Sequence, residues 1–356
     1  MAEFQNTIDL LGDEAVTKAL VERTITEFND DVMTSVAKYA FAYCTDLTSV
    51  NLPNVTSVDQ FAFQDCTSLA RVNIPNLTSL GNNMSCSVFH NCSKLTSVYF
   101  PLVEKLGTYA FRYCYSLQSA NLPSATSGSY TFNECTALED VSLPNLLSAG
   151  SDMFRDCTSL AFIDLPKATS IGSSVFRGCS KLTSVNFPNV KTIDSQAFSE
   201  CSALTSMNLP NATSIGVSAF NYCTALTDVN LPNATSIESS FSNCSSLEYL
   251  DLPKVSSIRG GAFQYCKKLT TLILRNTTVC TLENSYAFNN DTPFYTGGTG
   301  GTLLVPRSLT ASYQTATNWS SIFSGNANNR VLALEDYTID GTITGEIDWD
   351  KLGGTT

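Results

Sequence analysis

The fold of this protein is decided by a stretch such as CSALTSMNLPNATSIGVSAFNYC, which runs from Cys201 to Cys223. Cysteines recur in this way eleven times, and of the ten intervals between them seven are 22 residues, two are 21 and one is 26. Each has a phenylalanine three residues before it and a leucine three residues after it, which identifies an internal repeat. The repeat cysteines are Cys44, Cys66, Cys92, Cys114, Cys135, Cys157, Cys179, Cys201, Cys223, Cys244 and Cys266.

The apolar spacing of one copy predicts how a coil is built. Leu204, Met207 and Leu209 follow the L-x-x-L-x-L pattern of a leucine-rich repeat, and the second half of this pattern alternates as a short strand does. Met207 and Leu209 should face inward, with Ser206 and Asn208 outward, and the proline that follows should end strand pairing. One copy cannot bury its own apolar face, so successive coils must stack into a solenoid.

The cysteine column allows two interpretations. A disulfide framework would place the chain in an oxidising compartment. However, one cysteine per coil forms a column rather than pairs, so we interpret these residues as buried thiols that act as small hydrophobes. No C-x-x-C pair occurs, so no metal site is expected. Cys86 and Cys280 lie off the period, and a disulfide or a reactive thiol there stays open.

Composition excludes several classes of function. The chain has 356 residues with 20 Lys+Arg against 32 Asp+Glu, and this acidic balance argues against nucleic acid as a partner. The excess acid lies at the ends, with a net charge of −6 over residues 1–31 and −5 over 335–356. His90 is the single histidine, which excludes chemistry that needs two imidazoles. We find no signal peptide near the start and no apolar run that predicts membrane insertion.

With the unit written out, the chain resembles the BspA-like leucine-rich repeat proteins. Copies such as CTSLARVNIPNLTSLGNN and CSKLTSVNFPNVKTIDSQAFSEC carry the resemblance, which covers roughly residues 32–336. The segments TTVCTLENSYAF and LLVPRSLTASYQTATNWSSIF look like the closing segment of this family. The resemblance implies a binding or adhesion module of a bacterium or its phage, without catalytic residues. It implies a place at the cell surface, outside the cell or on a phage particle, although the chain shows no export signal.

We therefore expect an α/β-type, β-rich solenoid: a right-handed leucine-rich repeat coil stack with a parallel sheet on its concave face, capped at both ends. The expected parts are an N-terminal cap of short helix plus strand over 1–31, a solenoid of about eleven coils over 32–275, a closing coil and cap over 276–336, and an acidic tail over 337–356. Both caps follow from the need to cover open strand edges and apolar coil faces.

The caps carry more detailed expectations. At the N-terminus, Asp13 is a candidate N-cap for the short helix. At the C-terminus, Leu303–Val305 and Arg330–Leu334 read as strands, and Ser308 could cap a helix over 309–317. Tyr313 and Trp319 are expected to cover the last coil. The tail is predicted to form a loose hairpin with a disordered end.

The outward strand positions form the candidate ligand-binding surface. Most are Ser or Asn, which could simply form an amide ladder between coils. Aromatic and charged residues interrupt this pattern, and exposed aromatic groups beside polar ones suit a protein partner or a stacked glycan. The insertion at 81–88 is a second candidate loop, and His90 next to it is expected to be solvated. The candidate residues are Arg71, Tyr99, Asp140, Phe162, Asp164, Asp228, Tyr249 and Asp251.

Catalysis has little support in the sequence. Asp140 and Asp164 project from neighbouring coils, but an open face would leave both solvated, whereas an acid catalyst needs the raised pKa that burial gives. We expect a monomer that is not an enzyme and that needs no cofactor, and that binds a protein or a glycan on its concave face. Two alternatives stay open: a parallel β-helix polysaccharide-degrading enzyme and a structural rod in a larger assembly.

Overall fold

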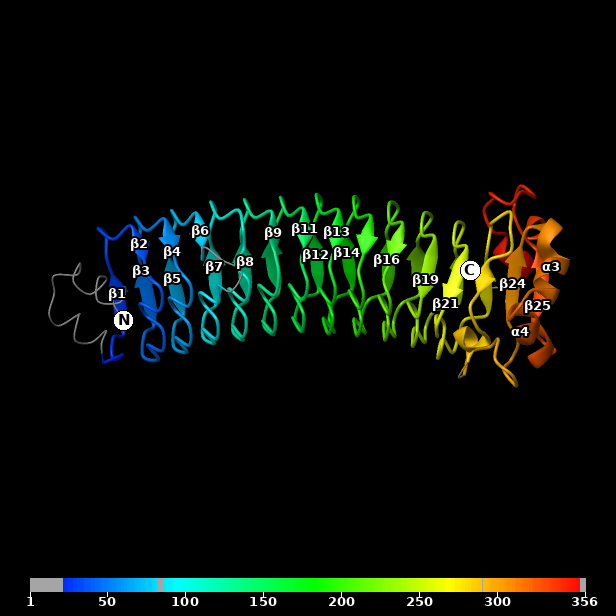
Figure 1. Cartoon of the computed structure of the whole chain (residues 1–356), viewed down its shortest axis with the longest axis horizontal. Coiled ribbons are helices and arrows are strands. Elements are labelled where there is room, and N and C mark those ends of the chain that lie inside the picture. The colour runs from blue at the N-terminus through cyan, green and yellow to red at the C-terminus, as the bar shows by residue number, and fades with distance from the viewer. Residues whose placement is uncertain (1–21, 82–85, 290, 353–356) are drawn as a thin grey trace. The chain divides into compact units, whose positions relative to one another are not determined.

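The computed structural model describes residues 22–81, 86–289 and 291–352. The chain folds as two compact units, Met1–Phe187 and Pro188–Thr356. In each unit the chain winds through successive coils that stack side by side (Figure 1). This is the predicted β-rich leucine-rich repeat solenoid. The N-terminal helix expected at Asp13 and part of the insertion, residues 82–85, lie outside the described residues.

Each coil of the first unit contributes a three-residue strand to a set of parallel pairings. The register places equivalent repeat positions opposite one another, as in the row Asn29, Asn51 and Asn73. The outward side chains of these strands, in both units, are called the first-strand face below. In this unit the strands are β1 (Glu27–Asn29), β3 (Ser49–Asn51), β5 (Arg71–Asn73), β7 (Ser97–Tyr99), β8 (Ser119–Asn121), β10 (Asp140–Ser142), β12 (Phe162–Asp164) and β14 (Ser184–Asn186).

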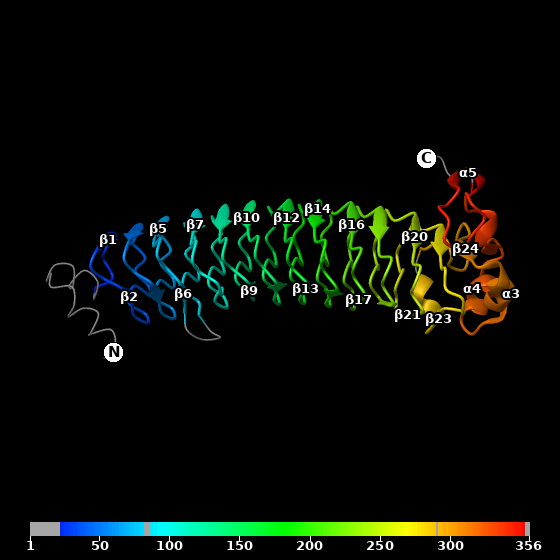
Figure 2. The ribbon, with the colours of Figure 1, turned by 90° about the horizontal axis from the view of Figure 1, so that it is seen from above.

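A second, shorter strand follows in most coils and was not predicted. It falls where the repeat reads Ser-Ile, with the serine outward and the apolar residue buried, as in Ser170 and Ile171. These strands also pair in parallel, so most coils carry two strands joined by turns (Figure 2). In the first unit they are β2 (Ser35–Val36), β4 (Ser57–Val58), β6 (Ser79–Leu80), β9 (Ser127–Gly128), β11 (Ser148–Ala149) and β13 (Ser170–Ile171).

The second unit repeats this plan and then closes it. Its three-residue strands are β16 (Ser206–Asn208), β18 (Asp228–Asn230), β20 (Tyr249–Asp251) and β22 (Thr271–Ile273), followed by the longer β24 (Thr302–Val305) and β25 (Arg330–Ala333). Met207 and Leu209 are buried and Asn208 is exposed, as predicted. The other strands are β15 (Thr192–Ile193), β17 (Ser214–Ile215), β19 (Ser236–Glu238), β21 (Ser257–Arg259) and β23 (Thr281–Leu282).

Columns of identical residues fill the interior of each unit. The repeat phenylalanines stack face to face, with ring centroids 5.0 Å apart for Phe41 and Phe63 and 5.4 Å apart for Phe132 and Phe154. Offset stacking at such distances adds stability beyond the area that the rings bury. The repeat leucines and cysteines are fully buried beside these rings. Equal repeat length is what brings identical side chains into contact.

The thiols form a ladder of their own. Cys157 Sγ donates to the carbonyl of Phe132 in the preceding coil at 3.1 Å, and the equivalent contact recurs at 3.0–3.2 Å along both units. Every cysteine among the described residues is buried and unpaired by disulfide, Cys86 and Cys280 included. The structure therefore agrees with small buried hydrophobes that act as weak donors.

Short helices cover the last coil of the second unit. Tyr313 and Trp319 are fully buried, and they bind both backbone groups of Cys280: its N–H donates to Tyr313 Oη at 2.8 Å, and Trp319 Nε1 donates to its carbonyl at 2.7 Å. The predicted cap on Ser308 is wrong, because helix α3 starts later and its N-cap residue makes no side-chain cap. The helices are η1 (Ser285–Phe288), η2 (Arg307–Leu309), α3 (Thr310–Thr315), α4 (Trp319–Gly325) and η3 (Leu334–Asp336).

The acidic tail is more ordered than predicted. Thr338 and Ile347 form an antiparallel bridge, and helix α5 (Trp349–Leu352) follows. Ile347 packs into a cluster with Ile273, Leu304 and Leu334, so the tail is held by burial rather than left loose. Within the second unit, α5 stands above the three-residue strands in Figure 2. The last four residues, 353–356, lie outside the described part of the chain.

Candidate functional site

The first-strand face carries a hydrogen-bonded amide ladder, as one interpretation of the sequence proposed. Asn73 Nδ2 donates to Asn51 Oδ1 at 2.7 Å, and Asn230 Nδ2 donates to Asn208 Oδ1 at 2.8 Å. Threonines that precede the strands add a second ladder, since Thr48 Oγ1 donates to the carbonyl of Thr26 at 2.9 Å. These bonds satisfy the polar groups of neighbouring coils, so much of the surface holds itself together.

Five predicted site residues lie on the first unit, and two of them are prominent aromatic groups. The side chains of Tyr99 and Phe162 are 57% and 51% exposed. Arg71 and Asp140 are exposed at the first position of their strands. Asp164 accepts a hydrogen bond from Asn186 Nδ2 at 2.8 Å and is thus a member of the ladder.

A shallow hollow lies near the N-terminal end of this face. Arg71 is the one charged side chain on its lining, which otherwise consists of serine, asparagine and valine. The lining residues are Ser49, Val50, Asn51, Arg71, Val72, Asn73 and Ser97. The hollow is open, so it suits a contact on a partner's surface rather than an enclosed small molecule.

The other three predicted residues lie on the second unit and differ from one another. Asp228 is exposed. Tyr249 is 38% exposed and its ring lies 4.5 Å, centroid to centroid, from the ring of Trp349 in the tail. Asp251 is bound by Arg275, with Nη2 2.6 Å from Oδ2. Asp251 therefore acts as a structural anchor, while Asp228 and Tyr249 stay accessible.

Sequence reasoning missed a second group of aromatic residues, at the turns before and after the repeat cysteine. The guanidinium carbon of Arg112 lies 5.3 Å from the ring centroid of Tyr109 and 4.4 Å from that of Tyr113. Tyr130 packs on Tyr109, and Tyr115 is 44% exposed. Tyr109, Tyr113 and Tyr130 have positive φ, a region where bulky residues are rare. We call these five residues the turn-side cluster.

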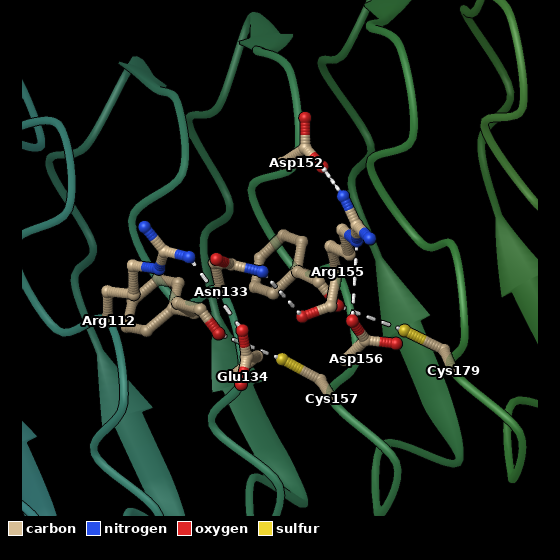
Figure 3. A network of polar contacts seen from close by, with 10 residues as sticks. Arg112, Asn133, Glu134, Asp152, Arg155, Asp156, Cys157 and Cys179 are labelled. Atoms are coloured by element: carbon tan, nitrogen blue, oxygen red, sulfur yellow. Dashed lines mark hydrogen bonds and ion pairs between the residues drawn. The ribbon is translucent and has the colours of Figure 1, made fainter.

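Charged groups beside the turn-side cluster pair with one another (Figure 3). Arg112 lies 3.8 Å from Glu134, while Arg155 lies 3.2 Å from Asp152 and 3.3 Å from Asp156. Exposed pairs of this kind contribute little stability, on the order of 0.2–1 kcal/mol each. The network therefore leaves little unpaired charge on this part of the surface.

His90 is packed rather than solvated, which corrects the prediction. Its ring lies edge-on to Tyr113 with centroids 5.2 Å apart, and its buried Nδ1 has no hydrogen-bond partner among the residues that the structure describes. Burial lowers the pKa of His90, an effect that Asp65 opposes and Arg112 reinforces. The imidazole is thus held as a neutral packing group.

The buried thiols offer no nucleophile. Burial raises the pKa of Cys266 and of Cys280 to about 12, and it raises that of the other repeat thiols whose pKa is shifted. The reactive form of cysteine is the thiolate, so these groups are inert. The described ranges contain no group of three His, Cys, Asp or Glu side chains placed to hold a metal ion. No helix among them has the length and apolarity to cross a membrane.

The coil stack, its strand face and its capped end define a leucine-rich repeat protein. The model of the BspA type leucine rich repeat region, in six copies, matches residues 11–127, 83–183 and 169–294, so the chain belongs to this family. Leucine-rich repeat proteins are generally non-enzymatic binding modules. No curated protein matches the sequence.

Solved structures of bacterial leucine-rich repeat proteins are similar to the chain. A leucine-rich cell surface protein from Faecalibacterium prausnitzii is 26% identical, with 75% of this chain and 86% of that chain covered and a TM-score of 0.47. A leucine-rich repeat protein from Bacteroides ovatus is 25% identical, with 75% and 91% covered and a TM-score of 0.38.

Proposed function

We propose that this protein is a non-enzymatic binding and adhesion module whose first-strand face binds a protein partner. The observation that carries the proposal is the exposure of Tyr99 and Phe162 on a surface that consists mostly of small polar residues. Aromatic residues are enriched among the few side chains that dominate binding energy at interfaces. Their neighbours in the ladders are already hydrogen bonded, so covering them leaves few polar groups unsatisfied.

The enzymatic alternative has less support. Asp140 and Asp164 are both exposed, and Asp164 accepts a hydrogen bond from Asn186. A general acid for glycoside cleavage needs a carboxyl group whose proton is retained near neutral pH, which burial provides and an exposed position does not. Incubation of the protein with mixed polysaccharides should release no reducing sugar, and clear turnover would contradict the proposal.

A protein and glycan array probed with the purified chain tests the proposal directly. For a protein ligand found there, Phe162→Ser and Tyr99→Ser should each weaken binding about tenfold, the loss typical of an interface anchor. Both variants should keep their thermal stability, because the two side chains are exposed. If only glycans on the array bind the chain, the ligand is a glycan and the proposal of a protein partner is wrong.

Tyr115→Ser is the matched control, because Tyr115 is a similarly exposed aromatic residue that lies outside the first-strand face. It should bind as the parent does. If Tyr115→Ser weakens binding and the two strand-face variants do not, the binding surface is the turn-side cluster and the proposal for the first-strand face fails.

A further inference from the structure

The tail of the second unit builds a corner at the end of the first-strand face. Trp349 lies against Tyr249, with ring centroids 4.5 Å apart and an angle of 51° between the ring planes. Tyr249 is 38% exposed and Trp349 is half-buried, so the pair keeps open ring area. On the first-strand face of this unit, β20 has β18 as its neighbour, and β18 starts with the exposed Asp228. Asp228, Tyr249 and Trp349 are called the aromatic corner below.

Asp228 is close enough to Tyr249 for the two groups to interact. Burial raises the pKa of the Tyr249 phenol, and the Asp228 carboxylate raises it further. Both residues occupy the exposed first position of neighbouring strands, so both side chains lie on the first-strand face of the second unit. The corner therefore combines a carboxylate with two electron-rich rings.

Several carboxylates next to the corner pair with cations. Glu248 lies 3.4 Å from Lys268, and Asp348 lies 3.3 Å from Lys351. Asp251 is bound by the guanidinium of Arg275 at 2.6 Å. Within the described residues, the carboxylate of Asp228 has neither a cation nor a hydrogen-bond donor as partner. The corner thus presents the carboxylate of Asp228, which has no partner among the described residues, beside aromatic faces.

We propose that the aromatic corner binds a basic side chain, lysine or arginine, of the protein partner. The cation would lie over the open faces of Tyr249 and Trp349, where the ring quadrupole attracts it, and would pair with Asp228. This inference rests on the proposed function, since it specifies the chemistry of the partner that the strands of the second unit would recognise. It adds Trp349, which belongs to the tail, to the binding residues.

Other ligand classes fit the corner less well. An anion would be repelled by the negative charge of Asp228. A neutral sugar would donate hydrogen bonds from its hydroxyl groups to Asp228 and stack on a ring, but it would leave the negative charge of the carboxylate without a counter-charge. A basic side chain satisfies both the rings and the carboxylate.

The two tryptophans of the chain provide the measurement. Trp319 is fully buried, with its indole N–H bound to the Cys280 carbonyl, whereas Trp349 lies at the corner. In a 1H–15N spectrum of the full chain, titration with a hexalysine peptide should shift the Trp349 indole signal saturably and leave that of Trp319 unmoved. A hexaglutamate peptide and a neutral oligosaccharide should move neither signal.

Substitutions distinguish specific binding of the peptide at the corner from non-specific attraction between an acidic protein and a basic peptide. Asp228→Asn and Tyr249→Leu should each weaken hexalysine binding about fivefold, whereas Tyr249→Phe should bind as the parent does. Asp46→Asn is the charge-matched control, because Asp46 is exposed on the first unit. Equal weakening by Asp228→Asn and Asp46→Asn, no shift of Trp349, or an equal shift with the oligosaccharide would each overturn the proposal.

This experiment can fail independently of the proposed function, because it uses a peptide and tests variants at the corner, with Asp46→Asn as its control. If partner binding depends on Phe162 but hexalysine does not bind, the proposed function is supported and the proposal for the aromatic corner is wrong. If hexalysine binds at the corner but Phe162→Ser binds the partner as the parent does, the proposal for the corner is supported. The main contact with the partner then does not involve Phe162.

Discussion

Arg275 and Asp251 form a bidentate ion pair, with Nε 3.0 Å from Oδ1 and Nη2 2.6 Å from Oδ2. Arg275 stands where the ten earlier copies of the repeat have proline. Its remaining nitrogen donates to the carbonyls of Ile343 and Gly345 at 2.7 and 2.9 Å, so one side chain joins the last strand copies to the tail. The break in the repeat is therefore the point at which the solenoid is tied to its acidic tail.

Loss of Arg275 should release the tail. Arg275→Ala leaves the partly buried Asp251 without its cation and frees two carbonyls, so we expect a loss of about 2–3 kcal/mol in unfolding free energy. Limited proteolysis should cut between 337 and 352 sooner than in the parent. Arg307→Ala is the control: its pair with Asp336 is more than half exposed, so the loss in unfolding free energy should be much smaller. Equal losses in both variants would contradict this role.

The cap should depend on Trp319. This side chain is fully buried, and Trp319→Ala is expected to cost about 3–5 kcal/mol through lost burial and the cavity left behind. The variant should also associate, because the open end of the second unit exposes strand edges and apolar residues. Size-exclusion chromatography and urea unfolding measure both effects. Tyr286→Ala, at an exposed position in η1, should change neither.

We expect the buried thiols to make the protein less stable at alkaline pH. Burial raises the pKa of Cys266 and Cys280 to about 12, so the folded protein keeps protons that an unfolded chain releases above about pH 8.5. The unfolding free energy should therefore be independent of these groups at lower pH. It should fall as the pH rises from about 8.5, by up to about 1.4 kcal/mol per pH unit for each thiol.

Urea midpoints between about pH 8 and 10 check this dependence. Cys157→Ala removes one buried thiol and should make the decline shallower. Native protein should also react with none of its cysteines in a thiol-reagent assay at about pH 8, while the unfolded chain exposes all 13. A rapid reaction of the repeat cysteines in the native protein would show that the thiols are accessible to the reagent, contrary to this prediction.

His90 should titrate below the ordinary range of histidine. Its burial lowers the folded-state pKa, so the neutral ring contributes stability above about pH 6.5, and this contribution is lost as the pH falls through the lower folded value. Because the chain has a single histidine, its imidazole signals in an NMR titration are unambiguous. A midpoint at or above about 6.5 would show that His90 is solvated, as sequence reasoning expected.

Most of the coil architecture could be predicted from the sequence, for a specific physical reason. Equal repeat length places identical residues in register, so the buried columns, such as Phe132 on Phe154, follow from spacing alone. The pairing Asn73 to Asn51 follows in the same way. The short second strands were missed, because two residues such as Ser170 and Ile171 are too few to give an alternating pattern.

Repetition carries no information about contacts that occur once, and those were left to the tertiary structure. The ring of Trp349 meets Tyr249 a hundred residues earlier in the chain, and Arg275 reaches carbonyls 68 and 70 residues away. No periodic pattern encodes such pairs, since each depends on how the tail folds back onto the last coils. The sequence by itself determined the repeating body and its family. Only the tertiary structure decided that Asp251 is an anchor and that Asp228 remains an open charge.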